Sequence, residues 1–125
     1  LFRSAVALDD DAFGSALEAA GSGTAVDDFD QVIHHLGTVH PSRYVKLIDG
    51  IHVLGLRDVS PLRNQTDALR FVAFVDRLYD AQVRVYATGT ALDQVFPEEM
   101  LSGGYRKKYL RAVSRLIALT TDAVG

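Results

Sequence analysis

The sequence predicts an α/β fold with a small parallel sheet built around one β-α-β unit. Three segments carry this prediction: an apolar stretch over about residues 51–57, an amphipathic stretch over about 65–81, and an alternating stretch over about 83–88. Two strands joined by a helix of this length are expected to lie parallel in one sheet. The flanking segments predict extra N-terminal helices and a basic C-terminal helix.

The N-terminal part of the chain predicts short elements. Residues 1–8 form an apolar run that suits a strand, and the acidic cluster at 9–11 suits the start of a helix to about Ala20. The glycines at 21 and 23 then indicate a loop. A second short helix is expected to open at Asp27 and Asp28 and to close at Gly37, with apolar residues at helical spacing: Phe29, Val32, Ile33 and Leu36. Pro41 is expected to start a further short helix that runs to about Ile48.

The segment 65–81 gives the clearest helical pattern in the sequence. Asn64 or Thr66 can cap its first turn. Its apolar residues fill one broad arc, which implies packing against a sheet; they are Ala68, Leu69, Phe71, Val72, Val75, Leu78 and Tyr79.

The last helix is expected over about 105–121 and combines an apolar face with a basic stripe. The predicted inner face consists of Tyr105, Tyr109, Ala112, Val113, Leu116 and Leu119. The stripe is Lys107, Lys108, Arg111 and Arg115, and such a row suits contact with phosphate or carboxylate groups or forms a solvated face.

Asp76 lies at the edge of the apolar arc of the long helix, so its carboxylate is expected to be half-buried. Such a group is costly to bury unless it is paired. Arg111 or Arg115 is the natural partner, and a structural ion pair is favoured over a catalytic acid. These three residues are therefore the candidate site, as phosphate contact or ion pair, and the sequence predicts no catalytic residue.

The sequence contains few other residues that could bind a metal, bind a ligand or catalyse a reaction. The four histidines (34, 35, 40 and 52) have no i, i+4 spacing of ligands, so no metal site is predicted. The segment 88–90, Thr-Gly-Thr, follows a predicted strand, where a ligand or an ordinary turn is expected. No G-x-x-x-x-G-K-[ST] segment, nucleophile–base pair or metal set is present, which argues against a free-standing small enzyme.

Length and composition limit the remaining classes. A chain of 125 residues with 48% hydrophobic and 23% charged residues fits one globular domain over 1–125. The only methionine is Met100, so we expect a fragment of a longer polypeptide. The absence of cysteine, of an 18-residue apolar run and of a basic leader favours the cytoplasm and no membrane span.

The charge of the chain is uneven along its length. The net charge is −6 over 1–40, −1 over 41–100 and +4 over 101–125. Because the basic stripe is short and the total charge is −3, we expect no nucleic-acid partner.

Four segments resemble the ZapE-type, AFG-like ATPases, which have an AAA-like P-loop core. The first, residues 28–44 followed by 51–53, has the order of the family's F-x-x-L … G-x-x-D-Y … V-x-L segment. Residues 69–80, LRFVAFVDRLYD, resemble the family block RRF-x-x-L-[IV]-D-x-L-Y-[DE], and 83–88 resemble the strand that follows it. Residues 111–116, RAVSRL, match the closing R-x-x-S-R-L motif. The resemblance covers about 28–121, whereas residues 1–27 are only weakly assigned. The chain departs from the family at Arg43, where Asp is usual, and at Ala118 and Leu119, where Glu-Met tends to stand.

The resemblance implies that the chain is the C-terminal part of an ATPase whose Walker motifs lie upstream. The parent protein would bind ATP and Mg²⁺ and act on a protein partner, in cell division on the tubulin-like division ring or in protein quality control. It also implies that Arg111 or Arg115 lies near phosphate, whereas the fragment alone is expected to hold no cofactor.

A protein-interaction module is the alternative reading. There the acidic helices or the basic stripe would recruit a partner without nucleotide. In the ATPase reading the chain packs on an upstream ATPase core. A helix with so wide an apolar arc, cut from that core, could instead bury itself in a homodimer.

Overall fold

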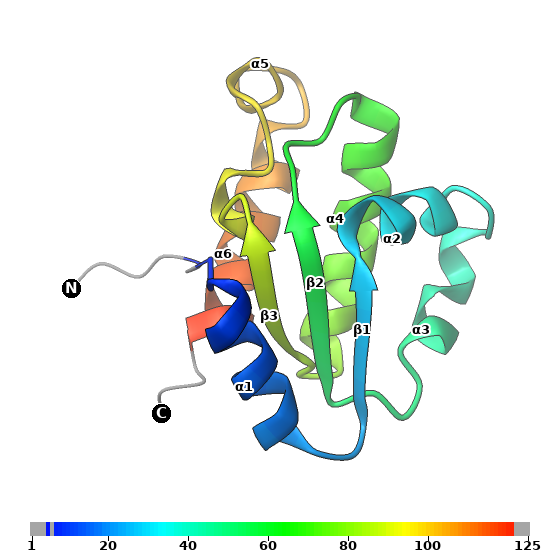
Figure 1. The fold of residues 1–125 in the computed structure, drawn as a ribbon. Coiled ribbons are helices and arrows are strands. Elements are labelled where there is room, and N and C mark those ends of the chain that lie inside the picture. The colour runs from blue at the N-terminus through cyan, green and yellow to red at the C-terminus, as the bar shows by residue number, and fades with distance from the viewer. Residues whose placement is uncertain (1–4, 6, 122–125) are drawn as a thin grey trace.

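The computed structural model describes residue 5 and residues 7–121, and it confirms the α/β class with a small parallel sheet (Figure 1). Three strands alternate with helices along the chain. The strands are β1 (Thr24–Asp28), β2 (Val53–Val59) and β3 (Arg84–Gly89). The helices are α1 (Asp10–Ala20), α2 (Phe29–Leu36), α3 (Tyr44–Leu47), α4 (Gln65–Asp80), α5 (Glu98–Leu101) and α6 (Arg106–Thr121), with short 3-10 turns at Pro41–Arg43 and Leu92–Gln94.

The predicted β-α-β unit is present as β2, α4 and β3. The strand order is β1-β2-β3, and both pairs are parallel. In the register, Leu54 of β2 lies opposite Ala25 of β1 and Val85 of β3. The observed bounds differ from the predicted ones by one or two residues, as expected for element ends.

The loop predicted at residues 21–23 is present, but the prediction failed at 24–28, where a strand that was not expected precedes the second helix. β1 covers Thr24–Asp28, and α2 begins only at Phe29. The strand is short and its last three residues are exposed. Its composition is poor for a strand, so hydrogen bonding to the apolar β2 decides its conformation rather than local propensity.

The predicted strand at residues 1–8 falls largely outside the described residues, which exclude 1–4 and 6. The described residues 5 and 7–9 form neither helix nor strand. The backbone N–H of Leu8 donates to the carbonyl of Ala87 at 2.8 Å, so the segment before α1 contacts β3.

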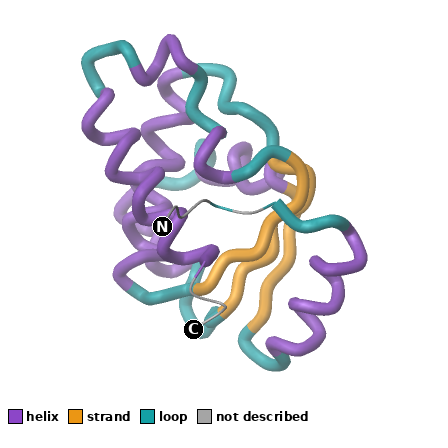
Figure 2. The backbone as a smooth tube through the Cα atoms, turned by 90° about the vertical axis from the view of Figure 1, so that its left-hand side faces the viewer, coloured by secondary structure: helices purple, strands orange, loops and turns teal. Residues whose placement is uncertain are grey.

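The helices form two unequal layers on the sheet. α1 lies alone on one face, and the other helices lie on the opposite face (Figure 2). Gly55 in the central strand permits the close approach of α1, because a Cβ at this position would lie 2.8 Å from Cζ of Phe13. The main core lies on the opposite face, where Leu54 and Leu56 pack against α2 and α4.

The long helices bury nearly the faces that the sequence predicts. α4 buries most of its predicted arc and also Phe74, which that arc leaves out, whereas Leu69 and Tyr79 of the arc are only half-buried. α6 packs against α4 and β3 and buries Tyr109, Ala112, Leu116 and Leu119. Tyr105 does not belong to this inner face, since it is 40% exposed and lies before the first turn of α6. No helix in the described part of the chain has both the length and the hydropathy needed to cross a bilayer.

Candidate functional site

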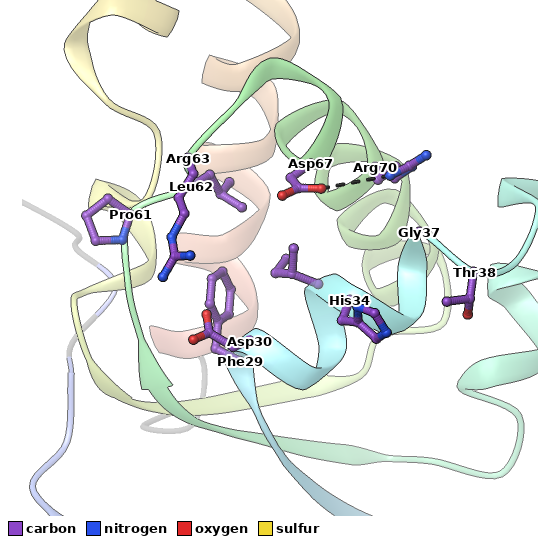
Figure 3. Close-up of a pocket in the computed structure, with 11 residues that line it drawn as sticks. Phe29, Asp30, His34, Gly37, Thr38, Pro61, Leu62, Arg63, Asp67 and Arg70 are labelled. Atoms are coloured by element: carbon purple, nitrogen blue, oxygen red, sulfur yellow. Dashed lines mark ion pairs between the residues drawn. The ribbon is translucent and has the colours of Figure 1, made fainter.

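A cleft of about 450 Å³ opens at the carboxyl ends of β1 and β2. Its walls come from the first two turns and the end of α2, from the loop after β2, and from the first turns of α4 (Figure 3). Ligands of open α/β sheets bind at this edge, and the volume lies in the range of small-molecule sites. The side chains that line it include Phe29, Asp30, His34, Arg63, Asp67 and Arg70.

The loop that carries Arg63 is fixed by contacts between the ends of β2 and β3. The backbone N–H of Asp58 donates to Oγ1 of Thr88 at 2.9 Å. Gly89 has φ +91°, and a Cβ there would lie 2.6 Å from the carbonyl oxygen of Val59, so only glycine fits this crossing. The predicted Thr-Gly-Thr segment at 88–90 therefore joins the two strand ends.

The cations of the cleft differ in how they are held. Arg70 lies 3.8 Å from the carboxylate of Asp67, and its guanidinium packs against Gly37, where a Cβ would lie 3.0 Å from Nη1. Asp67 also accepts from the Asn64 amide at 3.2 Å. The exposed Arg63 side chain has no hydrogen bond or ion pair with any residue that the structure describes.

The floor of the cleft is apolar and rigid. Phe29 and Leu62 are 2% and 4% exposed, and the ring of Phe29 meets that of Phe71 edge-on at 5.5 Å. The backbone N–H of Leu62 donates to the carbonyl of Val95 at 2.9 Å. These side chains belong to the buried core, so they support the cleft from below and offer a ligand very little surface.

Tyr44 is a buried support of α2, close to Arg70. Its hydroxyl donates to the carbonyl of Leu36 at 2.6 Å, at the last residue of α2. Burial raises the pKa of Tyr44, and the nearby Arg70 cation lowers it by a smaller amount. The phenol is thus neutral and can donate across the physiological pH range.

The predicted residues Asp76, Arg111 and Arg115 lie together, apart from the cleft. Nη1 of Arg115 is 2.5 Å from Oδ1 of Asp76, and Nη2 of Arg111 is 3.4 Å from Oδ2. Arg115 also lies over the ring of Tyr79, at 4.8 Å from the centroid. The side-chain exposures are 19% for Asp76, 28% for Arg115 and 51% for Arg111, so Arg111 is the open member of the cluster.

The histidines lie at separate places. His34 lines the cleft, whereas Nδ1 of His40 accepts from the backbone N–H of Ser42 at 3.1 Å. Within residues 5 and 7–121, no three His, Asp or Glu side chains form a group suited to a metal ion.

The residues of the cleft, of which Arg63 and Arg70 carry the positive charge, are not among the candidate site residues that the sequence predicts. Their positions in the sequence could have indicated a ligand site, because both residues follow β2 and lie at or near the start of the next helix. The cleft needs two adjacent strand ends, however, and the first of them, β1, was not predicted. Without β1 the residues 29–38 could not be placed beside 61–70.

Comparison with known proteins connects this fold with one family. The family model described as AFG1-like ATPase matches residues 8–124, almost the whole chain. Searches of curated proteins and of solved structures found no significant match. The match agrees with the sequence motifs on α4, β3 and α6 and indicates an ATPase-related, nucleotide-dependent role. The chain belongs to the AFG1-like ATPase family.

Proposed function

We propose that this chain is the C-terminal region of an ATPase whose ATP-binding and Mg²⁺-binding motifs lie outside the 125 residues. Two findings support the proposal: the family match over 8–124, and the lack of a G-x-x-x-x-G-K-[ST] segment in the sequence. In the whole protein the chain packs on the ATPase core, and ATP hydrolysis drives work on a cytoplasmic protein partner. The tubulin-like division ring and substrates of protein quality control are the partners that the family resemblance suggests.

The proposal depends on one structural observation, the exposed and loosely paired side chain of Arg111. The residue extends from α6, a helix whose opposite face is buried, so its base is rigid. Its guanidinium is 51% exposed and is held at 3.4 Å by Asp76, a distance longer than a normal charged hydrogen bond. Arg111 can therefore turn to a phosphate group, while Arg115 and Asp76 hold the helix surface in place.

ATP turnover by the full-length protein and by the 125-residue chain, compared under the same Mg²⁺ conditions, tests the proposal. We expect hydrolysis by the full-length protein and none by the chain alone, because the chain then lacks the catalytic motifs. Turnover by the isolated chain, or a well-folded full-length protein without ATPase activity, would contradict it.

A protein-interaction module is the second candidate, and exposed apolar side chains at the start of α6 favour it. Tyr105 and Leu110 are 40% and 38% exposed beside the basic stripe, and Nζ of Lys108 lies 5.5 Å from the ring centroid of Tyr105. Such a surface suits an acidic partner with apolar groups. Leu110→Asp would then abolish partner binding while ATP turnover by the full-length protein stays unchanged.

The homodimer expected from the apolar arc of α4 stays a prediction. The chain itself buries Phe71, Val75 and Leu78 of that arc. Sedimentation of the chain at micromolar concentration would decide whether a second copy associates.

A further inference from the structure

The two outer edges of the sheet differ in how they are covered. β3 forms one edge, and there the backbone N–H of Leu8 donates to the carbonyl of Ala87 at 2.8 Å. β1 forms the other edge and is the outermost strand on its side of the sheet (Figure 1). A strand edge that is left open can pair with an extended segment of another chain.

The hydrogen bonds between β1 and β2 identify which backbone groups of β1 face outward. The carbonyl of Gly23 accepts from the backbone N–H of Val53 at 3.2 Å. Successive residues of a parallel strand bond alternately to its two sides, so Ala25 bonds to β2. Thr24 and Val26 therefore point their N–H and C=O groups away from β2, and no described residue bonds these groups.

An apolar groove of about 250 Å³ lies beside this edge of the sheet. Ala25 of β1, Val32 of α2 and Leu47 of α3 line it, and all three are half-buried. Val26 lies opposite Gly55 in the register, so its side chain points to the α1 face, where it is 39% exposed. The side chains of an added strand alternate between the two faces, so one set would meet the groove and the other would meet Val26.

The acidic end of β1 determines the charge of a suitable partner. Asp27, Asp28 and Asp30 are exposed, and none of them has an ion pair among the described residues. Arg57 lies opposite Asp28 in the register, but its guanidinium lies over the ring of Phe13, 5.6 Å from the centroid. Pairing with a second copy would bring the aspartates of two chains to one interface, whereas a strand with Lys or Arg would compensate their charge.

We propose that the outer edge of β1 binds an extended segment of a partner protein, with apolar residues at alternate positions and a basic residue beside Asp27 and Asp28. The segment extends the sheet by one strand and hydrogen-bonds to the backbone of Thr24 and Val26. This inference does not depend on the proposed function, because it concerns other residues and needs no ATP hydrolysis.

Binding of the peptide KVTVTVK tests the inference, with the charge-reversed peptide EVTVTVE as its control. Amide NMR follows the titration of the 125-residue chain, and fluorescence anisotropy of labelled peptide follows that of the full-length protein. We expect saturable shifts at residues 24–28 and slower hydrogen exchange of the Thr24 and Val26 amides. EVTVTVE should bind at least tenfold more weakly, because it repels the aspartates.

Two N-methylated isomers of KVTVTVK show whether the backbone pairs. One isomer is methylated at the threonines and the other at the valines, so each loses the N–H groups of one edge of the extended peptide. We expect one isomer to keep the affinity of the parent peptide and the other to lose tenfold or more.

Two variants of the chain test the same contacts from the other side. Val26→Pro removes an N–H that faces outward, a position at which an edge strand tolerates proline, and should weaken KVTVTVK about tenfold. Asp28→Asn keeps a good N-cap residue for α2 and should also weaken KVTVTVK, because it removes one of the charges. Asp11→Asn is the matched control, since Asp11 is exposed in the first turn of α1, which packs on β2 and β3; it should leave the affinity unchanged.

Several results would overturn the proposal. They are equal affinities of KVTVTVK and EVTVTVE, equal affinities of the two methylated isomers, and equal losses in Asp28→Asn and Asp11→Asn. Shifts at residues 24–28 that depend on the concentration of the chain alone would assign the edge to a second copy instead. Binding to the 125-residue chain but not to the full-length protein would show that another part of the same protein covers the edge. The ATPase assay of the full-length protein can succeed or fail separately from these outcomes.

Discussion

At the scale of single residues, Tyr44 links the stability of the protein to pH. Burial holds its folded-state pKa above the ordinary value of 10.0. The corresponding stabilisation is fully present below pH 10.0 and is lost as the pH rises through the folded-state pKa, because the unfolded chain releases the proton first. We expect the unfolding free energy to fall more steeply above pH 10 in the wild type than in Tyr44→Phe.

The same substitution has a cost at neutral pH. Tyr44→Phe removes the hydrogen bond to the carbonyl of Leu36 and should cost about 0.5–1.5 kcal/mol. Urea unfolding at pH 7 and pH 10.5 measures both effects. If the unfolding free energies of the wild type and Tyr44→Phe fell equally between these pH values, the raised pKa of Tyr44 would be contradicted.

Tyr109 gives the opposite prediction at neutral pH. Its hydroxyl is buried and has no hydrogen-bond partner among the described residues, while its ring stacks on Phe96 with the centroids 5.0 Å apart. Tyr109→Phe keeps the ring and removes an unpaired polar atom, so we expect a change between zero and about 1 kcal/mol of added stability. A loss above about 1 kcal/mol in urea unfolding would show that the hydroxyl is satisfied.

Asp76 sets the stability of the α4–α6 contact. Arg115→Ala leaves its carboxylate, 19% exposed, with only the looser contact to Arg111. We expect a loss of about 1–2 kcal/mol, less than for a fully buried pair. Arg111→Ala should cost under about 0.5 kcal/mol, as is usual for an exposed charge. Equal effects of the two substitutions in thermal unfolding would contradict the difference in burial.

At the scale of elements, Gly89 holds the ends of β2 and β3 together. Gly89→Ala places a Cβ 2.6 Å from the carbonyl oxygen of Val59 at φ +91°, so we expect a loss of more than about 2 kcal/mol. Gly14→Ala is the control: Gly14 lies in α1 with nothing within 4 Å of a built Cβ, and the change should add about 0.5–1 kcal/mol. Similar changes in unfolding free energy for Gly89→Ala and Gly14→Ala, measured in denaturant, would contradict the claim that only glycine fits at position 89.

The elements that sequence patterns predict well are those whose own residues determine them. α4 has a wide apolar arc and an Asn64 cap, and β2 and β3 are rich in β-branched or apolar residues. β1 has a weaker signal, because only its first three residues are β-branched or apolar and the last two are aspartates, so its conformation depends on pairing with β2. Short edge strands of this kind are decided by tertiary structure.

At the scale of the whole molecule, the two candidate sites differ in how far the sequence reveals them. Helix periodicity predicts the cluster of Asp76, Arg111 and Arg115, since the apolar patterns of α4 and α6 each indicate a helix and the face that it buries. The cleft around Arg63 depends on the position of β1 and α2 relative to the loop after β2. That arrangement comes from the strand order, which no local pattern in residues 21–28 indicates.

The central claim is that Arg111 of α6 contributes to ATP hydrolysis by the full-length protein. The most direct test is the ATP turnover of the full-length protein carrying Arg111→Gln, compared with Arg77→Gln as the charge-matched control. We predict that Arg111→Gln lowers kcat about a hundredfold or more, as for arginines that stabilise phosphoryl transfer, and that Arg77→Gln leaves kcat unchanged. Equal kcat for the two variants, with both proteins folded, would contradict the account and favour the interaction module.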